Sequence, residues 1–324
     1  MILVTGGTGF VGRHVVKELS GRGHGVRVLA RNRTKAERLQ QETGCEIALG
    51  DVLKPETLPA ACQDVTAIIH LVGIIFEIGS ATYERIHVQG TRNMVEAART
   101  AGTRRFLHMS AIGTRPLAPS RYHQTKWAAE NLVRESDLDW TVFRPSVIYG
   151  RQDQFVRAFS TLMDFPFSLA SLGAMPLPYQ GTSLMQPVTV TAVAAAFVSA
   201  LTRKSAVGKT YELCGPQISM ADMLAAIAKA KGLKPVQLDV SLPAVPFFLP
   251  YYFLTRQQPV LFPVPGEIMR IAAWVVEHFS PIAVMNTDQM LMLQEDQNGD
   301  PEPATRDLDI NVPDFQTGIA FLKA

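Results

Sequence analysis

The sequence has few cysteines, few charged residues and no long apolar run. Its three cysteines, Cys45, Cys62 and Cys214, show no CxxC spacing. This argues against a disulfide framework or a metal site and favours reduced core residues. The 31 basic and 29 acidic residues nearly balance without forming a basic cluster, so nucleic acid is not an expected partner. No uncharged apolar stretch reaches the roughly 18 residues of a membrane span.

The chain opens with a short apolar run, a glycine motif and a helical pattern, in that order. Residues 2–4 are typical of a buried parallel strand. Three glycines follow at a spacing of three residues, Gly6, Gly9 and Gly12, and apolar residues then recur at helical spacing over about 10–22. Because the strand starts at the first residues, we expect no secretory signal and a cytoplasmic protein.

This order of strand, glycine turn and helix predicts a binding site for the diphosphate of a dinucleotide. A turn this tight needs residues that tolerate positive φ, and a diphosphate reaches the backbone N–H groups only where no Cβ intervenes. The helix N-terminus adds unpaired donors and a partial positive charge. A glycine motif alone is a weak signal, but its place behind a strand makes it specific. The predicted contacts are Gly6, Thr8, Gly9, Phe10, Val11 and Gly12.

The segment after the second predicted strand, residues 25–30, lacks the carboxylate that usually binds the ribose hydroxyls of NAD. Arg31 and Arg33 occur there instead. A carboxylate would repel the 2′-phosphate of NADP, whereas a guanidinium donates two hydrogen bonds to it. We therefore expect NADP(H) to be preferred over NAD(H); a solvated basic loop is the alternative interpretation. After a third strand over 46–50, Asp51 is suitably placed to meet the adenine amino group.

Strands and helical patterns continue to alternate along the chain. Apolar runs at 67–73 and 105–109 predict two more strands, with a helix over about 82–101 between them. His70, inside the first of these strands, is expected to be a core histidine with satisfied hydrogen bonds. Gly90 in the helix costs about 1 kcal/mol relative to Ala, so close contact with the sheet or the cofactor is expected there. The alternation predicts an α/β fold with a doubly wound parallel sheet.

Ser110, Tyr122 and Lys126 form the candidate catalytic group. Ser110 follows a strand at the sheet edge where ligands bind in open α/β folds. Tyr122 and Lys126 are four residues apart at the start of a predicted helix, which puts the phenol and the ammonium on one face. A free tyrosine titrates at about pH 10, and nearby positive charge lowers that pKa. We predict that Ser110 orients a substrate oxygen and that Tyr122 donates a proton.

Together these motifs resemble the short-chain dehydrogenase/reductase superfamily, in its extended or atypical branch. The resemblance rests on residues 5–12, 51–52, 70–73, 90–91, Ser110, Tyr122, Lys126 and 144–150. A closer likeness is to the NAD(P)H-binding accessory subunit of respiratory complex I and to its bacterial relatives, which are called NAD-dependent epimerase/dehydratase-like proteins. It runs through residues 86–91, 105–111, 126–130 and 140–145. The resemblance covers about the first 215 residues well and the rest loosely.

The resemblance implies a Rossmann-type cofactor domain with a smaller, partly helical C-terminal substrate domain. It also implies that Lys126 holds the nicotinamide ribose, as well as acting on Tyr122. Further cofactor contacts are implied at Val52, Leu71, Val72, Gly73, Pro145, Ser146 and Val147. Two departures argue against sugar chemistry. His87 occupies the position where sugar epimerases commonly carry an asparagine, and the interval between Ser110 and Tyr122 is short.

Residues 158–202 contain no lysine or arginine, and Asp164 is their only charged residue. Apolar side chains crowd the first part of this region and the residues just before it: Phe155, Phe159, Leu162, Met163, Phe165, Phe167, Leu169, Leu172, Met175 and Leu177. In the extended branch this region covers the nicotinamide pocket, and a nucleotide-sugar diphosphate would need cations there. We infer a small apolar substrate, such as a quinone or isoprenoid-like molecule, or no turnover. A phenylalanine-rich domain core is the equally weighted alternative.

The predicted domain boundaries follow from this insertion. Residues 1–150 and about 185–215 form the cofactor domain, and the second stretch returns to the sheet, continues as a helix and ends in a short strand. Residues 151–184 and 216–324 form the substrate or partner domain. Within it, Ser219 is the expected N-cap of a helix.

The C-terminal region is rich in proline between residues 242 and 265, too interrupted for a membrane span. An amphipathic helix is predicted over 267–279 and an acidic, turn-rich loop over 295–303. The helix either closes the small domain or docks on a partner or a membrane surface. We therefore consider respiratory-complex docking and peripheral attachment to the inner membrane face through this region.

Three functions stay open. The first, favoured by Ser110, Tyr122 and Lys126, is an NADP(H)-dependent oxidoreductase that acts on an apolar carbonyl or quinone-like substrate, with Tyr122 as proton donor. The second, favoured by the apolar C-terminal region, is a non-catalytic, cofactor-stabilised accessory or assembly subunit of a respiratory or quinone-synthesis complex. The third is a nucleotide-sugar epimerase/dehydratase.

Overall fold

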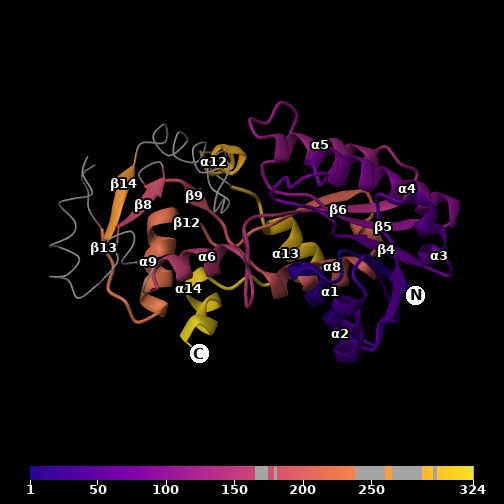
Figure 1. Cartoon of the computed structure of the whole chain (residues 1–324), viewed down its shortest axis with the longest axis horizontal. Coiled ribbons are helices and arrows are strands. Elements are labelled where there is room, and N and C mark those ends of the chain that lie inside the picture. The colour runs from indigo at the N-terminus through magenta and orange to yellow at the C-terminus, as the bar shows by residue number, and fades with distance from the viewer. Residues whose placement is uncertain (165–173, 179–180, 238–259, 265–286, 295–297, 324) are drawn as a thin grey trace. The chain divides into compact units, whose positions relative to one another are not determined.

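The structure, a computed structural model, describes residues 1–164, 174–178, 181–237, 260–264, 287–294 and 298–323 (Figure 1). The predicted helix over 267–279 and most of the proline-rich region lie outside these residues, as do Phe165, Phe167, Leu169 and Leu172. The chain divides into two compact units, each built from three stretches. Unit 1 comprises Met1–Ser146, Val190–Cys214 and Gly299–Asn311, and unit 2 comprises Val147–Thr189, Gly215–Asn298 and Val312–Ala324.

Unit 1 is built on a parallel sheet of seven strands in the order β3-β2-β1-β4-β5-β6-β11. The strands are β1 (Ile2–Thr5), β2 (Val26–Ala30), β3 (Glu46–Leu49), β4 (Ala67–His70), β5 (Arg105–Met109), β6 (Asp139–Pro145) and β11 (Lys209–Leu213). Every residue of β1 and β4 is buried, which explains why each strand is apolar up to its last residue. The predicted α/β fold with a parallel sheet is confirmed.

Helices cover both faces of this sheet (Figure 1). One face carries α1 (Phe10–Gly21), α2 (Arg33–Thr43), α8 (Val190–Thr202) and α13 (Glu302–Leu308). The other carries α3 (Leu58–Cys62), α4 (Gly90–Thr100) and α5 (Arg121–Arg134). Short 3₁₀ turns, η1 (Pro55–Thr57) and η4 (Lys204–Ala206), complete the connections. The chain leaves β1 toward one face and β4 toward the other, so the topological switch point lies between these two strands. Ligands of open α/β sheets bind at that point, outside the carboxyl ends of the strands.

The predicted helix over 82–101 is not uniform. Its first part is a π-helical turn, η2 (Glu84–Gln89), which leads directly into α4. Gly90 lies at the junction, where a Cβ would come within 3.0 Å of Val52 Cγ2. Gly90 therefore makes a close contact, but its partner is the loop after β3 and not the sheet; the expected contact with the cofactor stays a prediction.

Unit 2 contains α6 (Phe155–Leu162), α9 (Met220–Ala230), α12 (Thr287–Gln294), α14 (Phe315–Gly318) and the 3₁₀ turn η6 (Ala320–Lys323). Small sheets join β9 (Leu184–Met185) to β12 (Ile218–Ser219), and β7 (Ile148–Tyr149) to β10 (Val188–Thr189). A third joins β13 (Val236–Gln237), β14 (Val260–Val264) and β8 (Ala174–Pro178). The predicted return of the chain to the large sheet before α8 is therefore wrong, because β9 and β10 each pair with another strand of unit 2.

Two expectations for the smaller elements have different outcomes. Ser219 caps α9 as predicted, because its side chain accepts a hydrogen bond from the Asp222 N–H at 3.0 Å. The predicted loop over 295–303 is wrong at its end, since Glu302 begins α13 with Pro303 in its first turn. Proline is tolerated there because the first helical N–H groups have no partner within the helix.

Candidate cofactor and catalytic site

The glycine motif forms a tight turn between β1 and α1. The Gly9 N–H donates to the Gly6 carbonyl at 2.9 Å, and Gly6 has a φ of +74°. A Cβ on Gly6 would lie 3.2 Å from the Val72 nitrogen, and one on Gly12 would lie 2.1 Å from the Gly6 oxygen. A larger residue at Gly6 would collide with the backbone after β4, and one at Gly12 would push α1 away from the turn. The spacing of the motif is therefore required by backbone packing.

The N-terminus of α1 suits an anion. Its N-cap, Gly9, makes no side-chain capping bond, and the first turn contains no acidic residue. The N–H groups of a first helical turn have no partner within the helix and carry a partial positive charge. A glycine turn without Cβ atoms therefore leads to an uncapped helix end, which fits the diphosphate of a dinucleotide.

The residues predicted to select the nucleotide lie after β2 and β3. Arg31 Nη1 is 4.0 Å from Asp51 Oδ2, and the Arg31 side chain is 70% exposed. Arg33, in the first turn of α2, has its Nη1 3.9 Å from Glu37 Oε1. Both guanidiniums therefore have only long ion pairs in the described structure. The other Asp51 oxygen accepts a hydrogen bond from the Leu53 N–H at 3.0 Å.

The segment after β4 runs along the glycine turn. The Leu71 N–H donates to the Thr5 carbonyl at 3.2 Å, which continues the β1–β4 pairing to the sheet edge. Leu71 is buried, Val72 is half-buried and Gly73 is exposed. A Cβ on Gly73 would lie 3.6 Å from His87 Nε2 and 3.8 Å from Lys126 Nζ. Gly73 therefore brings the end of β4 beside the ammonium of Lys126.

Lys126 and Ser110 meet at the carboxyl end of β5. Lys126 Nζ donates to the Met109 carbonyl at 2.5 Å, next to Ser110 in the chain. The Ser110 N–H donates to the Phe143 carbonyl at 2.7 Å, and its buried hydroxyl lies 3.5 Å from Thr114 Oγ1. Burial lowers the pKa of Lys126 to about 8, against an opposing effect of Glu130. At neutral pH the side chain therefore still carries a proton.

Tyr122 precedes Lys126 by one helical turn in α5 and packs in an aromatic group. Its ring is edge-on to His87 at a centroid distance of 5.4 Å and to Tyr83 at 5.9 Å. The ring of His123 lies 5.3 Å away. Rings from the η2 segment therefore hold the phenol of α5, a relationship that the sequence pattern did not indicate.

Of the predicted nicotinamide segment, two residues belong to unit 1. Pro145 accepts a hydrogen bond from the Ile112 N–H at 3.0 Å, and the Ser146 N–H donates to the Leu213 carbonyl at 3.0 Å. The Ser146 hydroxyl is buried and has no hydrogen-bond partner among the residues that the structure describes. An orphaned hydroxyl at the sheet edge fits a polar ligand atom there. Val147 belongs to unit 2 and packs against the core of that unit.

Two histidines lie beneath this edge in neighbouring strands. His70 is fully buried, and its Nδ1 and Nε2 lie 2.7 Å and 3.2 Å from the hydroxyls of Thr5 and Thr91. The predicted core role of His70 is therefore confirmed. His108 is stacked on His70 at 5.6 Å, and neither of its ring nitrogens has a partner within the described part of the chain. Burial lowers the pKa of both, for His70 to about 3.

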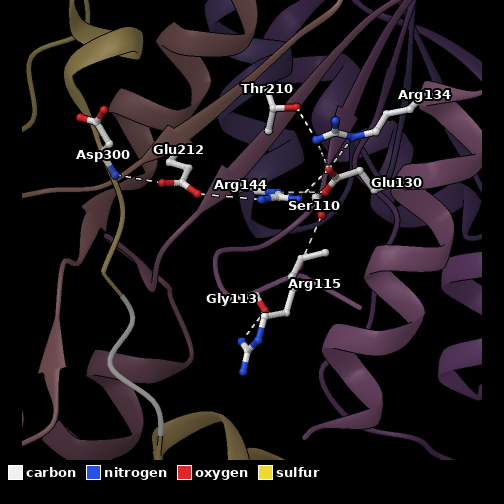
Figure 2. A network of polar contacts seen from close by, with 10 residues as sticks. Ser110, Gly113, Arg115, Glu130, Arg134, Arg144, Thr210, Glu212 and Asp300 are labelled. Carbon is white, nitrogen blue, oxygen red and sulfur yellow. Dashed lines mark hydrogen bonds and ion pairs between the residues drawn. The ribbon is translucent and has the colours of Figure 1, made fainter. Parts of the chain in front are cut away.

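A buried carboxylate, also missed from the sequence, joins α5 to the sheet (Figure 2). Glu130 is fully buried and accepts hydrogen bonds from Arg134 Nε at 2.8 Å and from Arg144 Nη2 at 2.8 Å. Arg134 continues to Thr210 Oγ1 at 2.8 Å, and Arg144 lies 3.9 Å from Glu212. Because Arg144 directly precedes Pro145, this network supports the backbone that leads to the predicted nicotinamide segment.

Comparison with known proteins agrees with this geometry. Residues 6–161 match the NAD(P)H-binding family. The chain is 30% identical over 240 residues to an NAD(P)H azoreductase of Xenophilus azovorans, a match that covers 73% of this chain and 76% of that protein. The chain belongs to the NAD(P)H-binding family.

A second relative confirms the resemblance to the complex I subunit. The chain is 31% identical over 230 residues to NADH dehydrogenase [ubiquinone] 1 alpha subcomplex subunit 9, mitochondrial, of Arabidopsis thaliana. That match covers 69% of this chain and 56% of the subunit, so the chain spans little more than half of the subunit's length.

A solved structure has the same fold as this NAD(P)H-binding protein. The NADPH complex of the NADPH-dependent quinone oxidoreductase QOR2 of Escherichia coli matches the full length of both chains, with a TM-score of 0.73 and 18% identity. At this identity the match shows a common fold. No helix in the described part of the chain is long and apolar enough to cross a bilayer.

Proposed function

We propose that the protein is an NADP(H)-dependent oxidoreductase that reduces an apolar carbonyl or quinone-like substrate. The observation that carries the proposal is the position of Lys126: its ammonium is bonded to the end of β5, lies beside Gly73 and is one helical turn from Tyr122. A charged side chain that is only 3% exposed costs free energy of desolvation on folding. A role at the reacting centre explains why it is present.

Each residue then has a defined task. When bound, the reduced nicotinamide supplies a hydride, which adds to an electrophilic carbon of the substrate. Ser110 holds the substrate oxygen by a hydrogen bond, and Tyr122 transfers its phenolic proton to that oxygen. Lys126 holds the ribose and favours the phenolate that is left behind. The glycine turn and α1 bind the diphosphate, and Ser146 offers its hydroxyl to the carboxamide end of the cofactor.

The preference for NADP(H) rests on Arg31 and Arg33. Both side chains are largely exposed and have only long ion pairs, so a 2′-phosphate offers them a stronger partner. NAD(H) lacks that phosphate and gains nothing from either guanidinium. Asp51 lies at the end of the neighbouring strand, where its carboxylate is available to the adenine amino group.

The apolar substrate rests on the shortage of cations in residues 158–202. Lys231, directly after α9, reaches this region, but its ammonium is bonded to the Ser160 carbonyl at 2.9 Å and to Asp164 at 2.6 Å. A sugar diphosphate would have to displace that ion pair. The described apolar residues here also serve the core of unit 2, where Met163 and Leu177 are buried. The names of two relatives, an azoreductase and a quinone oxidoreductase, agree with an unsaturated, apolar substrate.

The test is turnover of the purified protein with NADPH and a short-chain quinone, followed by the nicotinamide absorbance. We expect oxidation by the wild type and a loss of at least ~100-fold in kcat for Tyr122→Phe, because general acid catalysis contributes about that much. The dissociation constant of NADPH should stay within about twofold, since the ring remains. A Tyr122→Phe protein of full activity would rule out the proton-donor role.

A second candidate is a cofactor-stabilised accessory or assembly subunit. The match with the plant subunit of NADH dehydrogenase favours it. The same assay separates the two functions. If NADPH is not oxidised above background but stays bound through gel filtration, the protein acts as a binding subunit.

A further inference from the structure

The π-helical turn before α4 places an unusual residue next to the catalytic group. In η2 the Gly90 N–H bonds to the Arg85 carbonyl, five residues back, so this turn holds one residue more than an α-helical turn. Such single π turns are rare and occur often at functional sites. Here the extra residue allows three consecutive side chains, Ile86, His87 and Val88, to be buried. His87 is 1% exposed.

Both ring nitrogens of His87 have partners on different elements. The Ile74 N–H, in the loop after β4, donates to Nε2 at 3.1 Å. The Ile74 carbonyl also lies 3.1 Å from Nε2. In the tautomer that accepts from the Ile74 N–H, the ring proton lies on Nδ1, which donates to Thr125 Oγ1 at 2.9 Å. The Thr125 hydroxyl in turn donates to the Arg121 carbonyl at 3.0 Å within the first turn of α5. One imidazole therefore connects the loop beside Gly73 to the helix that carries Tyr122 and Lys126.

The faces and edges of the imidazole are also occupied. Tyr83 stacks on it at a centroid distance of 5.4 Å and an angle of 23°, and Tyr122 meets it at 5.4 Å and 87°. Tyr83 and Tyr122 are edge-on to each other at 5.9 Å. Three rings in mutual contact restrict rotation of the Tyr122 phenol. The position of the proton donor is therefore determined partly by η2.

The imidazole stays neutral in this place. Burial is the main cause, and the positive charge of Lys126 on α5 adds to it, so that the pKa of His87 falls to about 2. The Ile74 carbonyl opposes this shift, and His70 on β4 contributes to it weakly. A neutral ring can accept from Ile74 and donate to Thr125 at the same time. It is unsuited to act as an acid at physiological pH.

We propose that His87 is a positioning residue that sets the Tyr122 ring and the Gly73–Ile74 backbone relative to each other. The proposal rests on the proposed function, because it assigns these two features to proton transfer and to cofactor binding. In this role His87 affects the reaction indirectly. It acts through Tyr122 on one side and through the Ile74 N–H on the other.

Three variants separate the contributions of the ring. His87→Phe keeps the aromatic contacts and loses both hydrogen bonds. His87→Gln places an amide near the former Nε2 and restores the bond with Ile74. Thr125→Val removes the partner of Nδ1 without changing η2. We measure kcat and KM for the quinone, the dissociation constant of NADPH and the thermal midpoint of each holoprotein.

A positioning role predicts a large effect on kcat and a small effect on the dissociation constant of NADPH. His87→Phe should lower kcat by ~10- to 100-fold, the range expected for a displacement of about 1 Å at a reacting group. NADPH binding should change by less than about threefold. His87→Gln should recover most of kcat, and Thr125→Val should lose about three- to tenfold. Equal kcat for His87→Phe and the wild type would overturn the proposal, as would a loss of NADPH affinity that accounts for the whole effect.

A second readout does not depend on turnover. Amide exchange at Ile74 should be at least ~10-fold faster in His87→Phe than in the wild type, because the N–H loses its buried acceptor. If the wild type oxidises no nucleotide, the proposed function fails, and this measurement still tests the role of His87. Unchanged exchange at Ile74 would overturn the positioning role even in an active enzyme. If His87→Phe does not fold, the kcat of Thr125→Val and its amide exchange at Ile74 test the positioning role in its place.

Discussion

Lys126 is surrounded almost entirely by neutral groups. Burial and the charge of this lysine together lower the pKa of His70, His87 and His108, so all three imidazoles are uncharged at neutral pH. Glu130 is one turn along α5 and is the residue that raises the pKa of Lys126. A single positive charge is therefore kept in a polar but uncharged environment. This arrangement suits a site that must hold one cation close to a phenol.

The histidines make the fold sensitive to acid. A group whose pKa is lower in the folded state stabilises the protein above its unfolded pKa of about 6.5, and this stability is lost as the pH falls. The free energy of unfolding of the wild type falls between pH 7 and pH 5. In His108→Phe this fall should be smaller by about 2 kcal/mol. At pH 7 it should also stabilise the fold by about 1 kcal/mol, because a buried unpaired imidazole is removed. Urea titrations at both pH values measure this, with the partly exposed His24 replaced by Phe as control. Identical pH dependence of His108→Phe and the wild type would contradict the expectation.

At the scale of single residues, the sequence was informative wherever one position determines the chemistry. Gly6 has a φ of +74°, and a Cβ on Gly12 would meet the Gly6 oxygen, so both requirements are local and the motif was visible without the fold. His70 was expected to be a satisfied core residue and is one. The roles of His87 and His108 depend on which strands and helices are adjacent, and no local pattern contains that information.

At the scale of elements, Glu130 links α5, β6 and β11 through two arginines. Each guanidinium also packs over a tryptophan, Arg134 on Trp140 at 5.5 Å and Arg144 on Trp127 at 5.8 Å. The carboxylate is fully buried, whereas the Arg134 side chain is 33% exposed. Removing the carboxylate leaves Arg144 without its buried partner. The loss of stability should therefore come mainly from a weaker contact between α5 and the sheet.

We expect Glu130→Gln to lower the free energy of unfolding by about 3–5 kcal/mol, the usual cost of leaving one member of a buried ion pair unpaired. A triple variant, Glu130→Leu with Arg134→Met and Arg144→Met, removes all three charges and should recover most of that loss. Urea midpoints at constant m-value measure both effects. A Glu130→Gln protein as stable as the wild type would mean that the network contributes little.

The predictable elements are those with a local cause. The glycine turn, the strand before it and the Ser219 cap were predicted because each is determined by a few adjacent residues. The π turn was missed because residues 82–101 have a continuous helical pattern, and the extra residue in the turn is stabilised by contacts with Thr125 and Ile74. The pairing of β9 with β12 and of β10 with β7 was missed because strands of two residues carry no periodicity.

At the scale of the whole molecule, neither unit is a continuous part of the chain. The edge strand β11 and the covering helices α8 and α13 enter unit 1 from the second half of the sequence. The predicted cofactor contacts nevertheless come from the first 146 residues of unit 1, apart from Val147. Cofactor binding should therefore be detected in unit 1 as a local effect on the glycine turn and on the segment after β4.

NADPH at 100 times its dissociation constant should add about 2.7 kcal/mol to the stability of unit 1. Hydrogen exchange resolves where this occurs: amides of residues 6–13 and 71–73 should be protected, because a cofactor bound at this edge would stabilise the glycine turn and the segment after β4 against local opening. NADH at the same concentration should protect them less. In Arg31→Ala that difference should shrink while protection by NADH is kept, because the arginine contributes only through the 2′-phosphate. Equal protection by both nucleotides in the wild type would contradict the preference for NADP(H). The absence of protection in the glycine turn with either nucleotide would contradict cofactor binding at this edge of the sheet.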